Sequence, residues 1–252
     1  MDTTSGTGLP ASIEIAWGLR EKPTKGPKRG LSIDRIVEAA VHVAATDGLG
    51  AVAMGRVASE LGVGTMSLYR YVGAKDELYI LMSEAVFATG PPDVSGLGWR
   101  EGLATWARSL FDVLFAHPWV LRMPVSGPPA TPNQLRWMES GLIALRGSGL
   151  GEGEKISVML LVMGFVRSEV TVSSELTTAS AAQGITEQEA AQAYGRLMTT
   201  LVTPERFPAV AAAFAAGVAS EEDGPEIRFS WGLERVLDGV AALVADRHEP
   251  DS

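Results

Sequence analysis

The chain has 252 residues, of which 46% are hydrophobic, and its formal net charge is −9. It contains no cysteine, which excludes disulfide bonds, zinc–thiolate sites and a cysteine nucleophile. The longest apolar run, residues 158–166, is far shorter than a membrane span, and the first residues lack a charged-then-apolar signal pattern, so we expect a cytoplasmic protein with no membrane partner.

Residues 1–30 are predicted to form a basic, flexible arm. Five basic side chains gather ahead of the first long helix: Arg20, Lys22, Lys25, Lys28 and Arg29. Such a segment either lies along nucleic-acid phosphates or is an incidental feature of a Pro/Gly-rich tail, and the sequence leaves both interpretations open. The acidity lies elsewhere, because residues 1–82 carry nine Lys+Arg and nine Asp+Glu, whereas residues 83–252 carry 12 and 21. The apolar residues of this arm do not indicate where they pack: Ile13, Ile15, Trp17 and Leu19.

The first long helix is predicted between Ser32 and Gly48. Ser32 is a suitable N-cap, and Asp34 places a negative charge in the first turn, where it suits the helix dipole. Gly48 can end the helix because glycine adopts the left-handed conformation. Apolar residues recur at the spacing of one helical face: Ile33, Ile36, Val37, Ala40, Val41 and Ala44.

A helix-turn-helix follows. The short run from Met54 to Leu61 has inward-facing apolar residues and stops at Gly62. Residues 61–64 are too few for a surface loop, so two helices must cross steeply around a buried Val63.

The third helix is predicted to begin near Thr65, whose hydroxyl can cap it, and to run to Val72. Leu68 and Val72 should face back into the head, which leaves the polar and aromatic side chains for a DNA groove. Hydroxyls, phenols and guanidinium groups hydrogen-bond base edges and phosphates. The predicted groove contacts are Thr65, Met66, Ser67, Tyr69, Arg70 and Tyr71.

A fourth helix, from Lys75 to Ala88, is expected to connect this head with the rest of the chain. Free backbone N–H groups at its start and the Lys75 ammonium suit a phosphate, and Arg56 is assigned a second phosphate. A helical core with ordinary polar surface residues is the simpler interpretation, but it does not account for the ordered succession of cap, turn and aromatic-basic helix.

The sequence TMSLYRYVGAKDELYILM of residues 65–82 resembles the DNA-binding head of the tetracycline-repressor (TetR) family, over about residues 31–87. Trp99, the HPW of residues 117–119, and the segments 138–150 (MESGLIALRGSGL) and 229–244 (FSWGLERVLDGVAALV) resemble the ligand-binding half of the tetracycline-repressor subgroup. The resemblance implies an all-α fold. A helix-turn-helix DNA-binding domain (31–78) would be joined by the linking helix to a helical ligand-binding and dimerisation domain (79–252).

The second helix of the head departs from the family pattern. The family usually opens this helix with Ser or Thr and then a basic residue, whereas this chain has Ala53 or Met54, then Gly55, with Arg56 one step later. The cap is therefore weaker, and a glycine inside a helix costs about 1 kcal/mol relative to alanine.

The remainder of the chain is predicted to be helical throughout. Thr131 and Pro132 form a cap and first-turn pair, and Thr186 with Glu189 forms a capping box. Residues 156–172 are apolar on nearly every side and should be central. Residues 173–185 are rich in Ser, Thr and Ala without periodicity, and we expect them to form a mobile loop.

The last helix carries a long apolar stripe that we expect to dock on a partner: Leu233, Val236, Leu237, Val240, Leu243 and Val244. The family resemblance implies that this helix (226–245) and the central helix (155–172) pair with their copies in a four-helix bundle. The predicted partner is thus a second copy, and the homodimer would present two heads to a near-palindromic DNA operator.

The resemblance also implies a small-molecule pocket among the body helices. In the family a histidine holds a drug-bound magnesium ion. Pro124 corresponds to that histidine and Trp106 to a polar drug contact, so a bulkier, more apolar inducer is favoured over magnesium–tetracycline. Large or soft side chains are the candidate ligand contacts, although each also suits plain core packing: Trp106, Leu110, Trp119, Met123, Met138, Met159 and Met163.

No catalytic residue, metal site or cofactor is predicted. The three histidines His42, His117 and His248 stand at unrelated places, and neither a nucleophile elbow nor a phosphate-cradling glycine loop occurs. The favoured function is a ligand-responsive transcriptional repressor that a small, largely apolar molecule releases from DNA. The alternative is a helical small-molecule sensor or adaptor with little specific DNA binding. The sequence does not distinguish a repressor from an activator.

Overall fold

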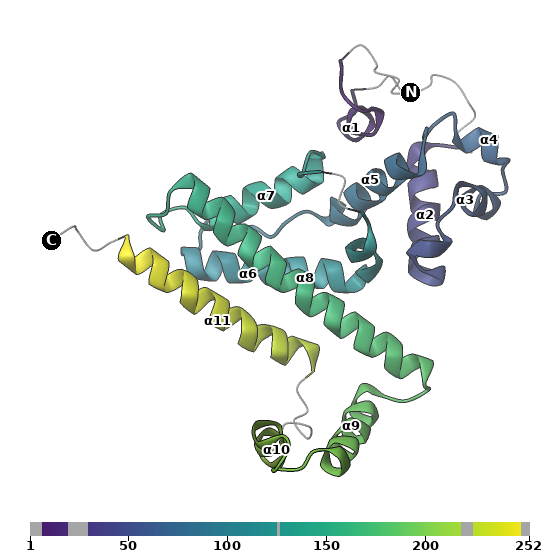
Figure 1. The fold of residues 1–252 in the computed structure, drawn as a ribbon. Coiled ribbons are helices and arrows are strands. Elements are labelled where there is room, and N and C mark those ends of the chain that lie inside the picture. Colours follow the sequence, from purple (N-terminus) through teal and green to yellow (C-terminus); the bar gives the residue numbers. More distant parts are fainter. Residues whose placement is uncertain (1–6, 20–29, 125–126, 218–223, 248–252) are drawn as a thin grey trace.

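A computed structural model describes residues 7–19, 30–124, 127–217 and 224–247, and every regular element in these ranges is a helix. The all-α prediction is therefore confirmed. In Figure 1 a head of short helices lies at one end, a body of longer helices lies beside it, and two short helices project beyond the far end of the longest helix.

Helix α2 (Ile33–Asp47) forms where the sequence predicts it. The Ser32 hydroxyl accepts a hydrogen bond from the Arg35 amide at 3.3 Å, and Ile36 and Ala40 are fully buried. The helix ends at Gly48, whose φ of +82° is positive as expected, although its ψ of 161° is extended rather than left-handed helical.

The turn after α3 (Met54–Glu60) depends on Gly62. Its φ is +66°, and the next amide, that of Val63, donates to the Ala58 carbonyl at 3.0 Å. This bond closes the C-terminus of α3 in the way that a left-handed glycine permits. Val63 is half-buried rather than buried.

Helix α4 is shorter than predicted and spans only Thr65–Leu68. Gly64 occupies the N-cap position and no side chain of the described residues caps the helix, so the expected capping role of the Thr65 hydroxyl is wrong. The chain then continues in turns, and Leu68 and Val72 are both fully buried, as predicted.

Helix α5 (Lys75–Val86), followed by the short 3-10 helix η2 (Phe87–Thr89), leads from the head into the body. Leu78 and Met82 are fully buried, and the helix packs against α2. The head is therefore mounted directly on the helix that enters the body (Figure 1).

The body consists of α6 (Trp99–Ala116), η3 (Pro118–Arg122), α7 (Pro132–Ala144), α8 (Glu152–Ala182) and α11 (Pro225–Asp246). Two glycines permit close helix packing. A Cβ atom at Gly141 would lie 2.9 Å from the Met159 sulfur and 3.1 Å from the Trp106 ring, and one at Gly232 would lie 2.7 Å from the Phe165 ring. Larger residues there would separate α7 from α6 and α8, or α11 from α8.

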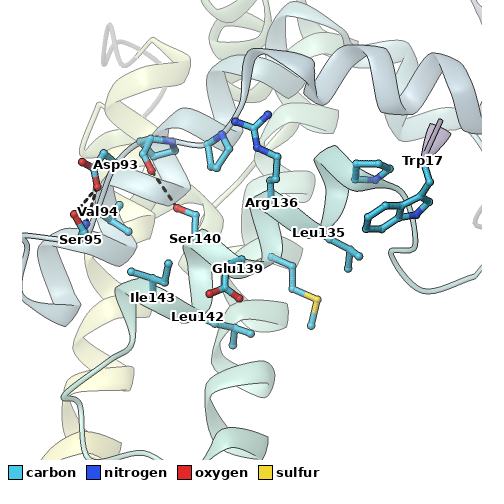
Figure 2. Close-up of a pocket in the computed structure, with 14 residues that line it drawn as sticks. Trp17, Asp93, Val94, Ser95, Leu135, Arg136, Glu139, Ser140, Leu142 and Ile143 are labelled. Carbon is cyan, nitrogen blue, oxygen red and sulfur yellow. Dashed lines mark hydrogen bonds between the residues drawn. The ribbon is translucent and has the colours of Figure 1, made fainter. Parts of the chain in front are cut away.

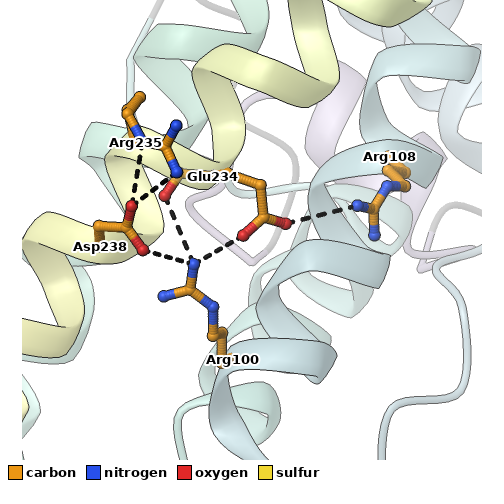
Figure 3. A network of polar contacts seen from close by, with 5 residues as sticks. All are labelled: Arg100, Arg108, Glu234, Arg235 and Asp238. Atoms are coloured by element: carbon orange, nitrogen blue, oxygen red, sulfur yellow. Dashed lines mark hydrogen bonds and ion pairs between the residues drawn. The ribbon is translucent and has the colours of Figure 1, made fainter.

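Aromatic stacking and ion pairs attach α11 to α6. The Phe229 ring stacks on Phe111, with centroids 4.3 Å apart. On the outer side, Arg100 of α6 contacts Glu234 at 2.6 Å and Asp238 at 2.7 Å (Figure 3). These charges are partly exposed, so the stacked rings contribute more to the attachment than the ion pairs do.

The loop predicted for residues 173–185 is wrong for most of its length, because α8 continues to Ala182. Hydroxyl groups along this stretch donate to the carbonyl four residues earlier, as Thr177 does to Ser173 at 3.0 Å and Thr178 to Ser174 at 2.7 Å. Because these hydroxyl groups find hydrogen-bond acceptors within the helix, Ser and Thr remain compatible with it.

Two short helices, α9 (Glu187–Leu201) and α10 (Pro208–Ala215), follow α8. The predicted capping box at the start of α9 is confirmed, because the Thr186 amide donates to the Glu189 carboxylate at 2.8 Å and the Glu189 amide donates to the Thr186 hydroxyl at 3.1 Å. The pair has no buried residue of its own.

Most of the apolar stripe on the last helix is covered within the single chain, although Val236 and Leu243 remain half-buried. The expectation that the stripe docks on a partner is therefore wrong for its four buried residues. Leu233 and Leu237 are fully buried, and Val240 and Val244 are only 3% and 7% exposed, within the single chain. The apolar side chains that α11 leaves open are instead Ile227 and Trp231, which are 54% and 67% exposed.

Helix α8 is the one helix, among the described residues, that is long and apolar enough to cross a membrane by length and composition. One face of α8 packs in the body core, with Val162 and Val166 fully buried. The other face carries exposed apolar side chains: Ile156, Leu160, Leu161, Val172 and Leu176.

The predicted flexible arm is wrong for part of its length. Residues 11–16 form a helix, α1 (Ala11–Ala16), that packs against α5. The basic residues 20–29 lie outside the described residues, so the interpretation of their role stays a prediction.

Candidate DNA interface and ligand site

The predicted groove contacts surround α4 on the outer surface of the head. Met66 is 76% exposed and Tyr69 is 44% exposed, and Arg70 is exposed as well. Thr65, Ser67 and Tyr71 are half-buried. Because Leu68 and Val72 anchor this segment from the inside, its hydroxyl, phenol and guanidinium groups are held on one surface that suits a DNA groove.

Lys75 and Arg56 flank this surface, and their charged groups have different partners. Lys75 is the first residue of α5, and its Nζ atom lies 5.1 Å from the centroid of the Tyr79 ring. Arg56 pairs with Glu60 at 2.5 Å and with Asp47 at 3.0 Å, and these hydrogen bonds raise its pKa. A phosphate would have to share Arg56 with two carboxylates. Among the described residues, Lys75 has no such carboxylate partner and lies over the Tyr79 ring.

Gly55 lies close to the same surface. Within the described part of the chain, a Cβ atom added there would meet only the Thr65 hydroxyl, at an ordinary 3.9 Å. Packing therefore does not require glycine at this position. The departure from the family pattern leaves space between the start of α3 and the start of α4.

The head is joined to the body by a hydrogen-bonded seam between α5 and α7. The Asn133 amide donates to the Glu84 carboxylate at 2.9 Å, and its side-chain amide donates to the Glu84 carbonyl at 3.1 Å. The Trp137 indole donates to the Phe87 carbonyl at 3.3 Å. A displacement of α7 would therefore be transmitted to α5, which carries the head.

The predicted ligand contacts lie in the body core but not in one cavity. Trp106, Leu110, Trp119 and Met159 are at most 6% exposed, and Met123, Met138 and Met163 are partly buried. The Trp106 indole donates to the Trp137 carbonyl at 2.9 Å, and its ring lies with Met159 around Gly141. This part of the core is closely packed.

Two cavities lie elsewhere. One of about 810 Å³ is bounded by the segment 91–95, α7 and Trp17, and Met138 is its only predicted ligand contact (Figure 2). The other, of about 540 Å³, lies between α2, α5 and His117. Neither cavity could be located from the sequence, because each is formed by segments that are distant in the chain. The one local signal is the Pro91-Pro92 pair, which interrupts the helical pattern and lines the larger of these two cavities.

Two buried polar atoms lie near the end of α6. Within the part of the chain that the structure describes, neither His117 Nδ1 nor Trp119 Nε1 has a hydrogen-bond partner. The two rings meet edge to face, with centroids 6.0 Å apart. Burial lowers the pKa of His117, which favours its neutral form. Buried groups of this kind are normally satisfied by water or by a ligand.

A helix-turn-helix head on a linking helix, joined through a hydrogen-bonded seam to a larger helical body, defines a one-component transcriptional regulator. Comparison with known proteins agrees. Residues 36–82 match the family described as bacterial regulatory proteins, tetR family, and residues 92–244 match the tetracyclin repressor-like C-terminal domain. The chain belongs to the TetR family and acts as a ligand-responsive transcriptional repressor.

Individual relatives support this assignment. The chain is 36% identical over 248 residues, 97% of its length and 90% of the relative's, to the HTH-type transcriptional repressor DrrR1 of Streptomyces coeruleorubidus. It is 26% identical to the HTH-type transcriptional repressor Rv1353c of Mycobacterium tuberculosis, over 92% of this chain and 87% of that one. Among solved structures, ActR of Streptomyces coelicolor in complex with actinorhodin aligns with a TM-score of 0.71 at 28% identity, over 87% of this chain and 100% of ActR.

Proposed function

We propose that the chain binds a near-palindromic operator as a homodimer and that a largely apolar small molecule releases it by entering between α6, η3, α7 and α8 and separating these closely packed helices. The observation that carries this proposal is the mounting of the exposed α4 surface on α5, which is itself hydrogen-bonded to α7. A ligand that moves α7 thereby changes the direction in which α4 points. We assign residues 31–78 to DNA binding and 79–252 to ligand binding and dimerisation.

Base and phosphate contacts are assigned to the side chains around α4. Tyr69, Arg70 and Thr65 can hydrogen-bond base edges, while Lys75 is the main phosphate contact at the start of α5. Arg56 contributes less, because Glu60 and Asp47 already hold its guanidinium.

Dimerisation is proposed through the open face of α8 together with Ile227 and Trp231 of α11. These large apolar side chains are between 38% and 67% exposed in the single chain, which is costly unless a second copy covers them. The two helices lie side by side in the body (Figure 1), so their open side chains can form one continuous interface with the same surface of a second copy.

The ligand is proposed to carry a hydrogen-bond acceptor as well as an apolar framework. The unpartnered Trp119 indole N–H would donate to that acceptor, and the buried surroundings would contact the framework. Since a solved relative binds actinorhodin, that compound is the first probe.

The test is fluorescence anisotropy with the DNA upstream of the gene for this chain. The wild type should bind this DNA more tightly than a scrambled duplex, and actinorhodin should release it. The variant Trp119→Phe keeps the ring and removes the donor, so it should bind DNA normally and require about tenfold more ligand for release. Absence of any preference for the upstream DNA would favour the alternative function, a ligand sensor or adaptor.

A further inference from the structure

The N-terminal helix α1 lies outside both family matches, which begin at residue 36 and end at residue 244. It has only six residues, Ala11–Ala16, and a helix this short is not stable in water by itself. Nevertheless Ser12 and Glu14 are only 1% and 2% exposed. Contacts with the rest of the chain must therefore hold α1 in place.

Those contacts lie on both sides of the seam between head and body. α1 packs against α5, the helix that carries the head. Immediately after α1, the Trp17 indole donates a hydrogen bond of 2.9 Å to the Ala130 carbonyl, 113 residues away. Ala130 directly precedes Thr131, the N-cap residue of α7, and lies three residues before Asn133, whose amide donates to Glu84 of α5.

Residues of this N-terminal segment also line the two cavities, one together with the head and the other together with the body. Ile15 and Ala16 line the cavity of about 540 Å³ together with Ile33 and Val37 of α2. Trp17 lies at one end of the cavity of about 810 Å³, where Figure 2 shows it beside Leu135 of α7. A single short segment thus contacts the linking helix and the body, and it lines a cavity together with α2 of the head.

We propose that α1 and Trp17 form an intramolecular clasp that restrains α5 against α7 and so stabilises the head orientation seen here. Any state in which α5 moves relative to α7 must lose either the packing of α1 on α5 or the bond from Trp17 to Ala130. The clasp therefore lowers the population of such states, and with it the ease with which a ligand reorients the head.

The clasp can be removed without touching the DNA surface or the proposed ligand contacts. Trp17→Phe keeps an aromatic ring and removes the N–H donor. Deletion of residues 1–19 removes α1 but retains the basic residues 20–29. Leu19→Ala is a matched control, because Leu19 lies in the same segment and is 55% exposed.

The experiment is native-state hydrogen exchange on the full-length wild type and these three variants. In Trp17→Phe and in the deletion, amides of α5 and the amide of Asn133 should exchange about threefold to tenfold faster, because one hydrogen bond and its packing no longer oppose local opening. The Leu19→Ala control should match the wild type. Amides in the buried part of α8, such as Val162 and Val166, should exchange at wild-type rates in all variants.

Two results would overturn the clasp. Equal exchange of α5 and Asn133 in all four proteins would show that α1 does not restrain the seam. Equal acceleration of α5 and of the α8 core would show that α1 contributes only to global stability. Neither result depends on DNA or ligand binding, so the proposed function would be unaffected.

Discussion

The close approach of α11 to α8 at Gly232 predicts that two Gly→Ala substitutions in α11 differ in their effect on stability. A Cβ atom at Gly232 would lie 2.7 Å from two carbons of the Phe165 ring. Phe165 cannot turn away freely, since its ring stacks on Phe229 at 5.6 Å, and Phe229 stacks on Phe111 at 4.3 Å. At Gly239, in the same helix, no described residue lies within 4 Å of such an atom.

Both Gly→Ala changes gain about 1 kcal/mol of helix propensity. Only Gly232→Ala also incurs an overpacking penalty, which is typically about 1 to 3 kcal/mol. We therefore expect Gly239→Ala to be more stable than the wild type by up to about 1 kcal/mol, and Gly232→Ala to be less stable than Gly239→Ala by about 1 to 3 kcal/mol. Urea unfolding of the three proteins, followed by circular dichroism, measures both differences. Equal stability of the two variants would refute the close packing of α8 and α11.

Three further predictions concern DNA binding, assembly and pH. Lys75→Ala should weaken binding to all DNA sequences and flatten the salt dependence by about one unit, whereas Arg70→Ala should also alter sequence preference; equal salt slopes for wild type and Lys75→Ala would remove Lys75 from the phosphate contacts. Trp231→Glu should leave a folded monomer in light scattering, because it replaces a large apolar side chain of the proposed interface by a charged one. Val240→Glu, at a position 3% exposed within one chain, should instead unfold the protein; a stable Trp231→Glu dimer would place the interface elsewhere. Burial lowers the pKa of His117 from its ordinary 6.5, so the unfolded chain binds this proton more readily and the free energy of unfolding should decrease as pH falls below that value. Urea titrations at about pH 5.5 and 7.5 measure this decrease in the free energy of unfolding, which should be smaller in His117→Asn than in the wild type. An equal decrease in both proteins would contradict the burial of the imidazole.

Local signals predicted the local structure well. Ser32, Gly62 and the Thr186–Glu189 pair each determine a helix end through hydrogen bonds made within a few residues, and the structure shows all three. The prediction of a loop at residues 173–185 was wrong for an equally local reason. Its hydroxyls bond back to their own helix instead of competing with it.

Long-range contacts account for the remaining differences. The periodicity of α11 showed that one face is apolar but could not show that α6 and α8 of the same chain cover it. Likewise, nothing near Trp17 in the sequence indicates Ala130, and nothing near Arg56 indicates that Asp47 would hold it. The candidate ligand residues were identified by size and softness, which core packing also requires, so their role stays a prediction.

A ligand bound in the body should change the affinity of the head for DNA. The most direct measurement is a titration of actinorhodin against the preformed complex of the full-length protein with its upstream DNA, in parallel with calorimetric binding of actinorhodin to the free and the DNA-bound protein. We expect actinorhodin to release the DNA, and DNA binding to weaken the affinity for actinorhodin by the same factor, usually about 5- to 150-fold. Tight binding of the ligand in the body with no change in DNA affinity would contradict this expectation.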